Sequence, residues 1–322
     1  MRFGSLYDAG DKAVREGIIT FAAAKLLNVN LGKVEELVDD QRLACLSQRI
    51  PLELNSTTRI VQANEMKQVH MRVWLKIDAT FESMVTVSAS EPLLSEAAYS
   101  PMAQTSFNVS KAMKSVLDGF PIDQGDRGEF LIMLLFTVAR DKTVGPPTEH
   151  GLPAGSRIVD VAPFLTERLF QNTFELQELL MDFRGGKMHF NHYIKVHEYV
   201  VIEAESLLLL FSRGAGILCA DTQFPIDGIN PFLCNGPKLD LGNLGLILWQ
   251  GKSDSAFAAT YWPTLFAAMD VYELGILKEG DTAVPLIKIV FTLAARTPGS
   301  QTPTIHGIQR YCLRYLVCGY FA

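Results

Sequence analysis

The sequence predicts an α/β fold, in which a mixed sheet is flanked by helices, together with a mainly helical N-terminal region. Three strand-like segments follow one another between residues 216 and 252, and a helical pattern and a further buried-strand candidate at 285–295 come after them. This β-β-β-α-β order, with at least one helix before it, is typical of the α/β class. Residues 1–125 instead repeat most of their apolar side chains at helical spacing, which favours a separate helical region.

The N-terminal region, residues 1–125, is interpreted as mainly helical. Residues 13–27 and 34–46 carry apolar side chains at the spacing of one helix face. The stretch 73–87 fits two periods, because its odd positions alternate as in a strand while other apolar residues fit a helix, and we favour a helix for its first half. Residues 88–106 contain turn-forming residues without a steady period, so we expect a linker there.

The second region, residues 126–322, is predicted to be the α/β domain and to open with a helix. Asp126 and Glu129 stand directly before a strongly apolar run, and carboxylates in a first turn stabilise the N-terminus of a helix. Residues 142–200 are predicted to form a helical insertion with a strand in its last part. A short helix at 203–213 then leads into the sheet.

Three strands are predicted at 216–221, 226–233 and 244–252, followed by a mostly helical stretch at 255–277. The third strand is almost continuously apolar, as expected for a strand that is buried on both faces. Pro231 lies inside the second strand and cannot donate a hydrogen bond to a neighbour. We therefore expect it at an edge or at a bulge.

Composition excludes several classes of protein. Apolar residues make up 48% and charged residues 20% of the chain, which is a globular composition. Its longest apolar runs are shorter than the roughly 20 residues of a membrane helix, so we expect no membrane partner. The start of the chain lacks an apolar signal segment, and the five cysteines lack regular spacing, so we expect an intracellular protein, cytoplasmic or nuclear, with reduced thiols.

The net charge of −6 argues against binding nucleic acid through overall charge. The excess of acids is concentrated in the first part of the chain, because positive and negative residues nearly balance from residue 187 onward. A local basic groove in the second region is therefore possible.

The candidate site consists of Asp227, at the start of one predicted strand, and Gln250 and Lys252, at the end of the next. Side chains two apart on a strand share a face, so Gln250 and Lys252 point the same way while Gly251 turns away. Such a set can hold Mg²⁺ or Mn²⁺ against a phosphate: Asp227 would be the anchoring ligand, and Gln250 could offer its amide oxygen. Lys252 would orient or help to deprotonate the attacking water and offset charge building on the phosphate. Alternatively, Asp227 opens a hairpin turn and the other two residues form a solvated strand end.

The sequence IDGI, followed further along the chain by LWQGK, resembles the second and third motifs of the PD-(D/E)XK nuclease superfamily, in the Gln-x-Lys variant of some restriction endonucleases. The wider stretches RGEFLIMLLFTVARD and SRGAGILCADTQFPIDGINPFL are similar to uncharacterised basidiomycete fungal proteins, related to Crinkler-type proteins with a nuclease-like C-terminal domain. The resemblance covers roughly residues 126–295. It implies a restriction-endonuclease-like core and a hydrolase that uses magnesium.

The same resemblance implies a first-motif glutamate on the helix before the sheet, either Glu129 or Glu205. Glu129 requires the long insertion 142–200 between helix and sheet, whereas Glu205 lies directly before the first core strand. The sequence departs from the family pattern at two points, since Ile226 separates Pro225 from Asp227 and the third-motif acid is replaced by Gln250. Loss of that acid leaves an inactive nuclease-like protein as an alternative.

Other chemistries find less support. His189, His192 and His197 lie close together, but their spacing shares no single face of a helix or strand. There is no HExxH pattern and no paired CxxC, which argues against zinc, and no GxSxG elbow for a serine hydrolase.

The sequence therefore predicts a Mg²⁺- or Mn²⁺-dependent nucleic-acid phosphodiesterase. Asp227 and Glu129 would bind the metal, Gln250 would assist them, and Lys252 would act on water and phosphate. The alternative is a catalytically inactive scaffold with the same fold, which binds a protein or nucleic-acid partner.

Overall fold

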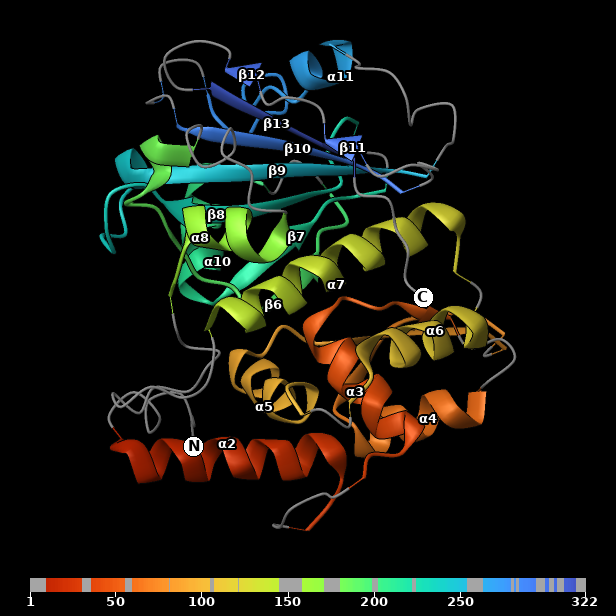
Figure 1. The fold of residues 1–322 in the computed structure, drawn as a ribbon. Coiled ribbons are helices and arrows are strands. Elements are labelled where there is room, and N and C mark those ends of the chain that lie inside the picture. Colours follow the sequence, from red (N-terminus) through yellow and green to blue (C-terminus); the bar gives the residue numbers. More distant parts are fainter. Residues whose placement is uncertain are drawn as a thin grey trace. The chain divides into compact units, whose positions relative to one another are not determined.

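The computed structural model describes most, but not all, residues of the chain. The described residues are 10–30, 36–55, 60–80, 82–104, 107–120, 122–144, 158–170, 180–198, 202–221, 224–253, 263–278, 281, 284–293, 299–300, 304–305 and 310–316. The chain divides into two compact units (Figure 1). Unit 1 comprises Met1–Asp123 with Gly145–Arg157, and unit 2 comprises Gln124–Val144 with Ile158–Ala322.

Unit 1 combines helices with a small antiparallel sheet. Its helices are α2 (Lys12–Leu27), α3 (Asp39–Arg49), α4 (Ile60–Val69), α5 (Pro92–Met102) and α6 (Val109–Gly119). Its three strands are β1 (Leu54–Asn55), β2 (Arg72–Ile77) and β3 (Met84–Ser88), in the order β1-β3-β2.

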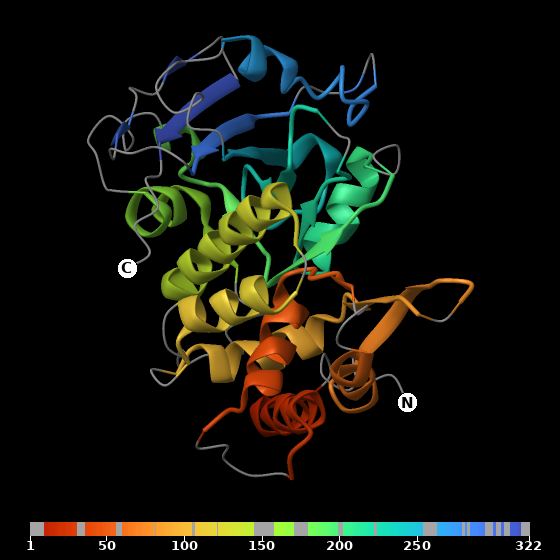
Figure 2. The same ribbon diagram turned by 90° about the vertical axis from the view of Figure 1, so that its right-hand side faces the viewer.

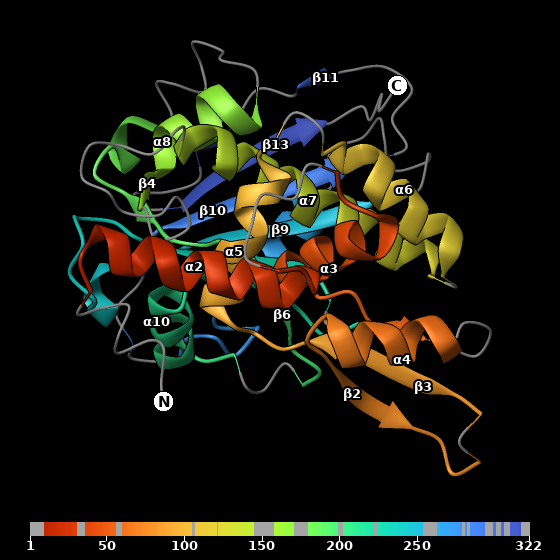
Figure 3. The same ribbon diagram turned by 90° about the horizontal axis from the view of Figure 1, so that it is seen from below.

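Two expectations for this unit are wrong. The first half of 73–87 is not a helix: it is strand β2, which pairs with β3 through Val73↔Val87 and Trp74↔Thr86 (Figure 3). The alternation of apolar residues at odd positions was therefore the correct indicator of structure, and the competing helical spacing was not. The expected linker at 88–106 contains helix α5, which begins with a proline at its first position and a Glu91 side chain that accepts a hydrogen bond from Leu93 N.

Unit 2 is built on a ten-stranded mixed sheet. The central strands are β7 (Ala215–Leu218), β8 (Gly228–Leu233), β9 (Leu244–Lys252), β10 (Leu286–Thr292) and β13 (Arg310–Leu316). The β7–β8 and β8–β9 pairs are antiparallel, whereas β9–β10 and β10–β13 are parallel. The predicted mixed sheet with flanking helices is thereby confirmed, and the short helix α11 (Pro263–Ala268) stands between β9 and β10 in the chain.

The segment expected to be a helical insertion, 142–200, also contributes strands. After the end of α7 it contains β4 (Val159–Asp160), β5 (Lys187–Met188) and β6 (His192–Lys195), and β6 runs parallel to β7. Its helical parts are short: α8 (Val161–Pro163), the π-helix η2 (Phe164–Leu169) and the 3₁₀-helix η3 (Leu180–Phe183). The sheet therefore extends into the insertion.

Pro231 lies in an interior strand, at a point where one of the two ladders is interrupted. It faces Leu246 of β9, but on the other side of β8 the register with β7 ends at Ile229 and the register with β5 begins at Phe232. Leu246 N donates to the Pro285 carbonyl, on the side of β10, rather than to β8. The missing N–H of the proline thus falls in the gap between two partner strands.

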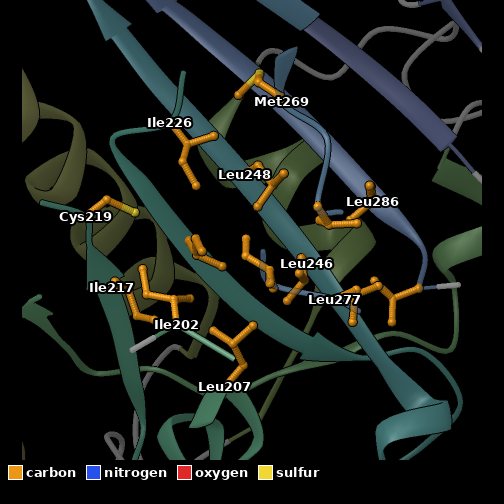
Figure 4. Packing of buried hydrophobic residues seen from close by; sticks show 14 of the residues in the cluster. Ile202, Leu207, Ile217, Cys219, Ile226, Leu246, Leu248, Met269, Leu277 and Leu286 are labelled. Carbon is orange, nitrogen blue, oxygen red and sulfur yellow. The ribbon is translucent and has the colours of Figure 1, made fainter. Parts of the chain in front are cut away.

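Different helices cover the two faces of the unit 2 sheet. Helix α7 (Gln124–Val144) lies beside the strands in Figures 1 and 2, and its Phe136 ring packs against Trp249 of β9 and Phe291 of β10, with centroids 6.1 and 5.8 Å apart. The other face packs on α10 (Ala204–Ser212) and α11 (Figure 4). This second core is formed by Leu207, Ile217, Ile229, Leu246, Leu248, Leu265, Phe266, Leu286 and Val290.

Among the residues described, no helix combines the length and the apolar character that crossing a membrane would require. Cys45, Cys219 and Cys234 are free thiols.

Candidate functional site

The candidate site lies where β8 begins and β9 ends. Gly228 is the Cα partner of Trp249, so extending this antiparallel register by one residue places Asp227 opposite Gln250. Asp227 N donates to the Trp249 carbonyl at 2.9 Å, which continues the pairing just beyond β8. Opposite residues in an antiparallel pair share a face, and two predicted site residues are therefore neighbours.

The carboxyl group of Asp227 is the centre of this arrangement. Its Oδ2 accepts a hydrogen bond from Gly251 N at 2.6 Å, and the side chain of Gln250 hydrogen-bonds to it as well. Burial raises the pKa of Asp227 to about 6, although these hydrogen bonds and the positive charge of Lys252 act in the opposite direction. The cost of burying this carboxylate is therefore only partly offset by its neighbours.

Gly251 allows a helix to approach the strand end closely. A Cβ at this position would lie 2.5 Å from Ile132 Cδ1 of α7 and 3.5 Å from Asp227 Oδ2. Real Cβ atoms do not show the first distance, so a larger residue here would require the end of the Ile132 side chain to shift. The same helix carries Glu129, one turn before Ile132.

Glu129 and Asp227 influence one another. Burial and, to a smaller extent, the negative charges of Asp227, Asp126 and Asp221 raise the pKa of Glu129 to about 8, while Lys195 acts in the opposite direction. Two carboxyl groups close together in a partly buried place disfavour each other's ionised form. Glu205, the rival candidate, is exposed in the first turn of α10 and is not among the groups that shift either pKa. The structure thus couples Glu129, and not Glu205, to Asp227.

Two buried polar atoms at the strand ends have no hydrogen-bond partner among the described residues. They are Gln250 Oε1, in a residue that is 3% exposed, and Thr292 Oγ1, in a residue that is 6% exposed. Because an ionised carboxylate only accepts, Gln250 uses its Nε2 for Asp227, and its oxygen is left over. An unpaired buried polar group destabilises the folded state by about 1–3 kcal/mol, so a ligand that bonded to either oxygen would stabilise this region.

Four neighbours of the site were missed by sequence reasoning. Lys195 at the end of β6 pairs with Asp221 at 2.8 Å, and its side chain is only 9% exposed. Cys219 N donates to the Asp227 carbonyl at 2.8 Å. Thr292 is the parallel register partner of Lys252. The register of the sheet strands brings these residues together, and sequence alone does not fix that register. The one sequence signal was that Cys219 and Asp221 stand in the same short stretch as Asp227, GILCADTQFPID.

Oxygen ligands for a hard cation are present, although a closed protein cage is not. In the described part of the chain no group of three or more His, Cys, Asp or Glu is arranged to hold a metal ion. Mg²⁺ needs fewer protein ligands, since it usually keeps several waters and binds one or two carboxylates. Asp227, Glu129 and the unpartnered oxygen of Gln250 fit such a cation and do not fit the ligand set of zinc.

The clustered histidines have unrelated surroundings. His189 Nδ1 is 2.9 Å from the Phe211 carbonyl, and His192 Nδ1 is 2.6 Å from Asn191 Oδ1. His192 is buried, and His197 is exposed. The described histidines therefore do not converge on a common metal site.

Comparison with known proteins gives a family without an assigned activity. The family described as "Domain of unknown function (DUF8736)" matches residues 35–248, which is more than half of the chain. The chain belongs to the DUF8736 family. The matched segment includes Glu129 and Asp227 and ends two residues before Gln250. No curated protein and no solved structure matches the chain.

Proposed function

We propose that unit 2 of this DUF8736 protein is a divalent-cation-dependent phosphodiesterase that acts on nucleic acid, a PD-(D/E)XK-like nuclease of the Gln-x-Lys variety. The observation that carries the proposal is the environment of the Asp227 carboxyl group. It is buried and accepts hydrogen bonds from Gly251 and from the Gln250 side chain. It also interacts electrostatically with Lys252 and Glu129. Two acids, a neutral oxygen donor and a lysine are the groups that this chemistry uses.

Asp227, Glu129 and Gln250 Oε1 would hold Mg²⁺ or Mn²⁺. When bound, such a cation polarises a phosphoryl oxygen and makes water a better nucleophile. Binding would give Gln250 Oε1 the partner that it lacks among the described residues, and it would offset the negative charge that two neighbouring carboxylates accumulate. The three residues thus gain stability from the ligand that the reaction needs.

Lys252 supplies positive charge beside these acids. An ammonium group donates three hydrogen bonds and accepts none, so it can orient a water molecule and bind a phosphate oxygen together. In hydrolysis the water oxygen forms a bond to phosphorus while the ester P–O bond breaks, and the proton that the water loses is balanced by the proton that the departing oxygen gains from solvent. Lys252 offsets the negative charge that develops on the phosphoryl oxygens during this exchange.

The alternative is a nuclease-like scaffold that binds a protein or nucleic-acid partner without cleaving it. Position 250 carries a neutral amide where the family pattern has an acid, and this lowers the charge available to a cation. The described residues also contain no group of three or more His, Cys, Asp or Glu around one point. These two observations favour the scaffold, and the experiment below separates it from the enzyme.

The test is cleavage of supercoiled DNA, single-stranded DNA and RNA by the full chain with Mg²⁺ or Mn²⁺, and with EDTA as the blank. The informative variants are Asp227→Asn and Lys252→Met, which keep the size of the side chain. Matched controls are Asp240→Asn and Lys238→Met, because these two residues form a surface ion pair at 3.1 Å elsewhere in unit 2.

We expect cation-dependent cleavage by the wild-type protein and by both controls, and a loss of at least about a hundredfold in the two site variants. Thermal unfolding verifies that each variant is folded. Cleavage that survives in both Asp227→Asn and Lys252→Met would place the activity elsewhere. A folded wild-type protein that cleaves none of the three substrates and binds neither cation by calorimetry would leave the scaffold.

A further inference from the structure

Thr292 ends strand β10 directly beside Lys252. The parallel register pairs Lys252 with Thr292 and Gln250 with Val290, so the threonine side chain lies on the same face as Gln250 and Lys252. Neighbouring strands lie about 4.8 Å apart, which brings the hydroxyl within reach of a ligand that Lys252 contacts. Thr292 is 6% exposed, and its Oγ1 has no hydrogen-bond partner among the described residues.

Acceptors and donors both line this edge of the sheet. Asp227 and Gln250 contribute acceptors, namely the carboxylate oxygens and the Oε1 that has no partner among the described residues. Lys252 contributes an ammonium group, whose charge also acts on Asp227, and Thr292 on β10 contributes a hydroxyl, which can donate. Acceptors suit a cation, and donors suit an oxyanion.

We infer that Thr292 contacts phosphate, and that its hydroxyl and the Lys252 ammonium together bind a non-bridging oxygen of a nucleic-acid phosphodiester on the β10 side of β9. The inference rests on the proposed function. It deepens that function by placing the bound phosphate next to Thr292, at the end of β10. The hydroxyl oxygen is buried in the free chain, so a local displacement at the end of β10 accompanies binding. Such a bond would give the side-chain oxygen of Thr292 the partner that it lacks among the described residues.

The chain offers a matched control for the loss of a buried hydroxyl. Thr137 in α7 is 0% exposed, and its Oγ1 also lacks a partner within the described residues. It stands eight residues beyond Glu129, about 12 Å along the helix axis. Thr292→Val and Thr137→Val therefore remove the same group from equally buried positions, only one of which adjoins Lys252.

The experiment measures binding of a short fluorescein-labelled DNA duplex, single strand and RNA by anisotropy in EDTA, across a range of salt concentrations. Cleavage kinetics with Mn²⁺ are measured on the same preparations. We expect Thr292→Val to weaken binding or kcat/KM by about tenfold to a hundredfold, the value of a hydrogen bond to a charged group. Thr292→Ser should restore most of the loss, and Thr137→Val should match the wild type.

The salt dependence distinguishes the hydroxyl from the charge. Thr292→Val should leave the slope of log affinity against log salt unchanged, because threonine is neutral, whereas Lys252→Met should reduce its magnitude by about 1. If Thr292→Val does not fold, Thr292→Ala replaces it with the same expectation.

Failure of the inference differs from failure of the proposed function. Wild-type affinity and kinetics in a folded Thr292→Val variant would overturn the phosphate contact while cleavage still depends on Asp227. An equal loss in Thr137→Val would assign the effect to packing and would also overturn it. A wild-type protein that binds but never cleaves would overturn hydrolysis alone, and one that binds no nucleic acid would overturn both.

Discussion

Two buried charged groups, one in each unit, show how differently this chain treats charge. Arg72 of unit 1 is 2% exposed and donates to the carbonyls of Leu52, at 2.7 Å, and Thr86, at 2.5 Å, and to the Thr86 hydroxyl at 3.1 Å. The Asp227 carboxyl of unit 2 accepts hydrogen bonds from Gly251 N and from the Gln250 side chain, but it lies near a second acid, Glu129. The hydrogen bonds of Arg72 stay within unit 1, although burial lowers its pKa to about 9, whereas Gln250 Oε1 beside Asp227 has no partner among the described residues.

Under the proposed function, the difference is that between a structural charge and a charge arranged for a ligand. Arg72 ties strands β2 and β3 to the segment before β1, and every bond it makes is internal to unit 1. In unit 2 the negative charges repel each other, and an amide oxygen beside them remains unpaired among the described residues. Unsatisfied buried polar groups and raised carboxyl pKa values occur often at functional sites, and for this reason we propose a ligand here.

The largest expected effect is on the stability of unit 1. Arg72→Met removes the donor to two buried carbonyls and to the hydroxyls of Thr86 and Ser88, and it should lower the free energy of unfolding by about 3 kcal/mol or more. Urea denaturation followed by circular dichroism measures the change. Lys76→Met, on the same strand but exposed, is the matched control and should change stability by less than about 0.5 kcal/mol. A loss of similar size in both variants would remove the structural side of the comparison.

The second effect is a gain of stability, in contrast to the loss expected for Arg72→Met, and it depends on pH. The pKa values of Asp227 and Glu129 are raised in the folded protein to about 6 and about 8. The unfolded chain loses these protons near pH 4 and the folded chain only later. Without a cation, stability contributed by the two groups should therefore be complete below about pH 4 and fall as the pH rises towards 8.

Substitution and cation should each cancel this loss. Asp227→Asn and Glu129→Gln should raise the thermal midpoint in EDTA at pH 8.5 and change it little at pH 5. Mn²⁺ should raise the thermal midpoint of the wild-type protein more at pH 8.5 than at pH 5. It should have no such effect on a variant that carries both Asp227→Asn and Glu129→Gln. Differential scanning fluorimetry across pH measures both. A wild-type midpoint that Mn²⁺ leaves unchanged at every pH would contradict a cation site at these acids.

The third effect tests the approach of α7 to the strand end. Gly251→Ala places a Cβ 2.5 Å from Ile132 Cδ1, and it should destabilise unit 2 by about 1–3 kcal/mol. Ile132→Val removes the atom that clashes, so the double variant should recover part of the loss. A double-mutant cycle by chemical denaturation measures the coupling. Strict additivity would mean that the two residues do not meet, and Gly236→Ala is unsuitable as a control because its backbone φ is positive.

Sequence reasoning located the strands of unit 2 because their patterns are strong and local. The predicted segments 216–221, 226–233 and 244–252 correspond to β7, β8 and β9 with shifts of a few residues. The site residues Asp227, Gln250 and Lys252 could be proposed because two are neighbours in sequence and the third stands at the start of the adjacent strand. Where two periods competed, as at 73–87, the pairing of β2 with β3 decided the outcome.

Thr292 and Lys195 could not be found in the same way. Both belong to strands whose alignment with β9 or β7 depends on register, and register is fixed by packing across the whole sheet. The choice between Glu129 and Glu205 also required the fold. Both stand on helices before the sheet, but only the α7 residue interacts electrostatically with Asp227, and the same helix contacts Gly251 through Ile132.

The smallest expected effect concerns the residue that departs from the nuclease pattern. Gln250→Glu converts a neutral ligand into a third carboxylate beside Asp227, so it should lower stability in EDTA and strengthen Mn²⁺ binding by about tenfold, which is about 1.4 kcal/mol. Isothermal titration calorimetry measures the affinity, and Gln48→Glu, at a buried glutamine of unit 1, is the control. The control should lose stability without gaining affinity for the ion. An unchanged Mn²⁺ affinity in Gln250→Glu would mean that the side-chain oxygen at this position does not face the cation. The acids of unit 2 would then bind a ligand other than a metal ion.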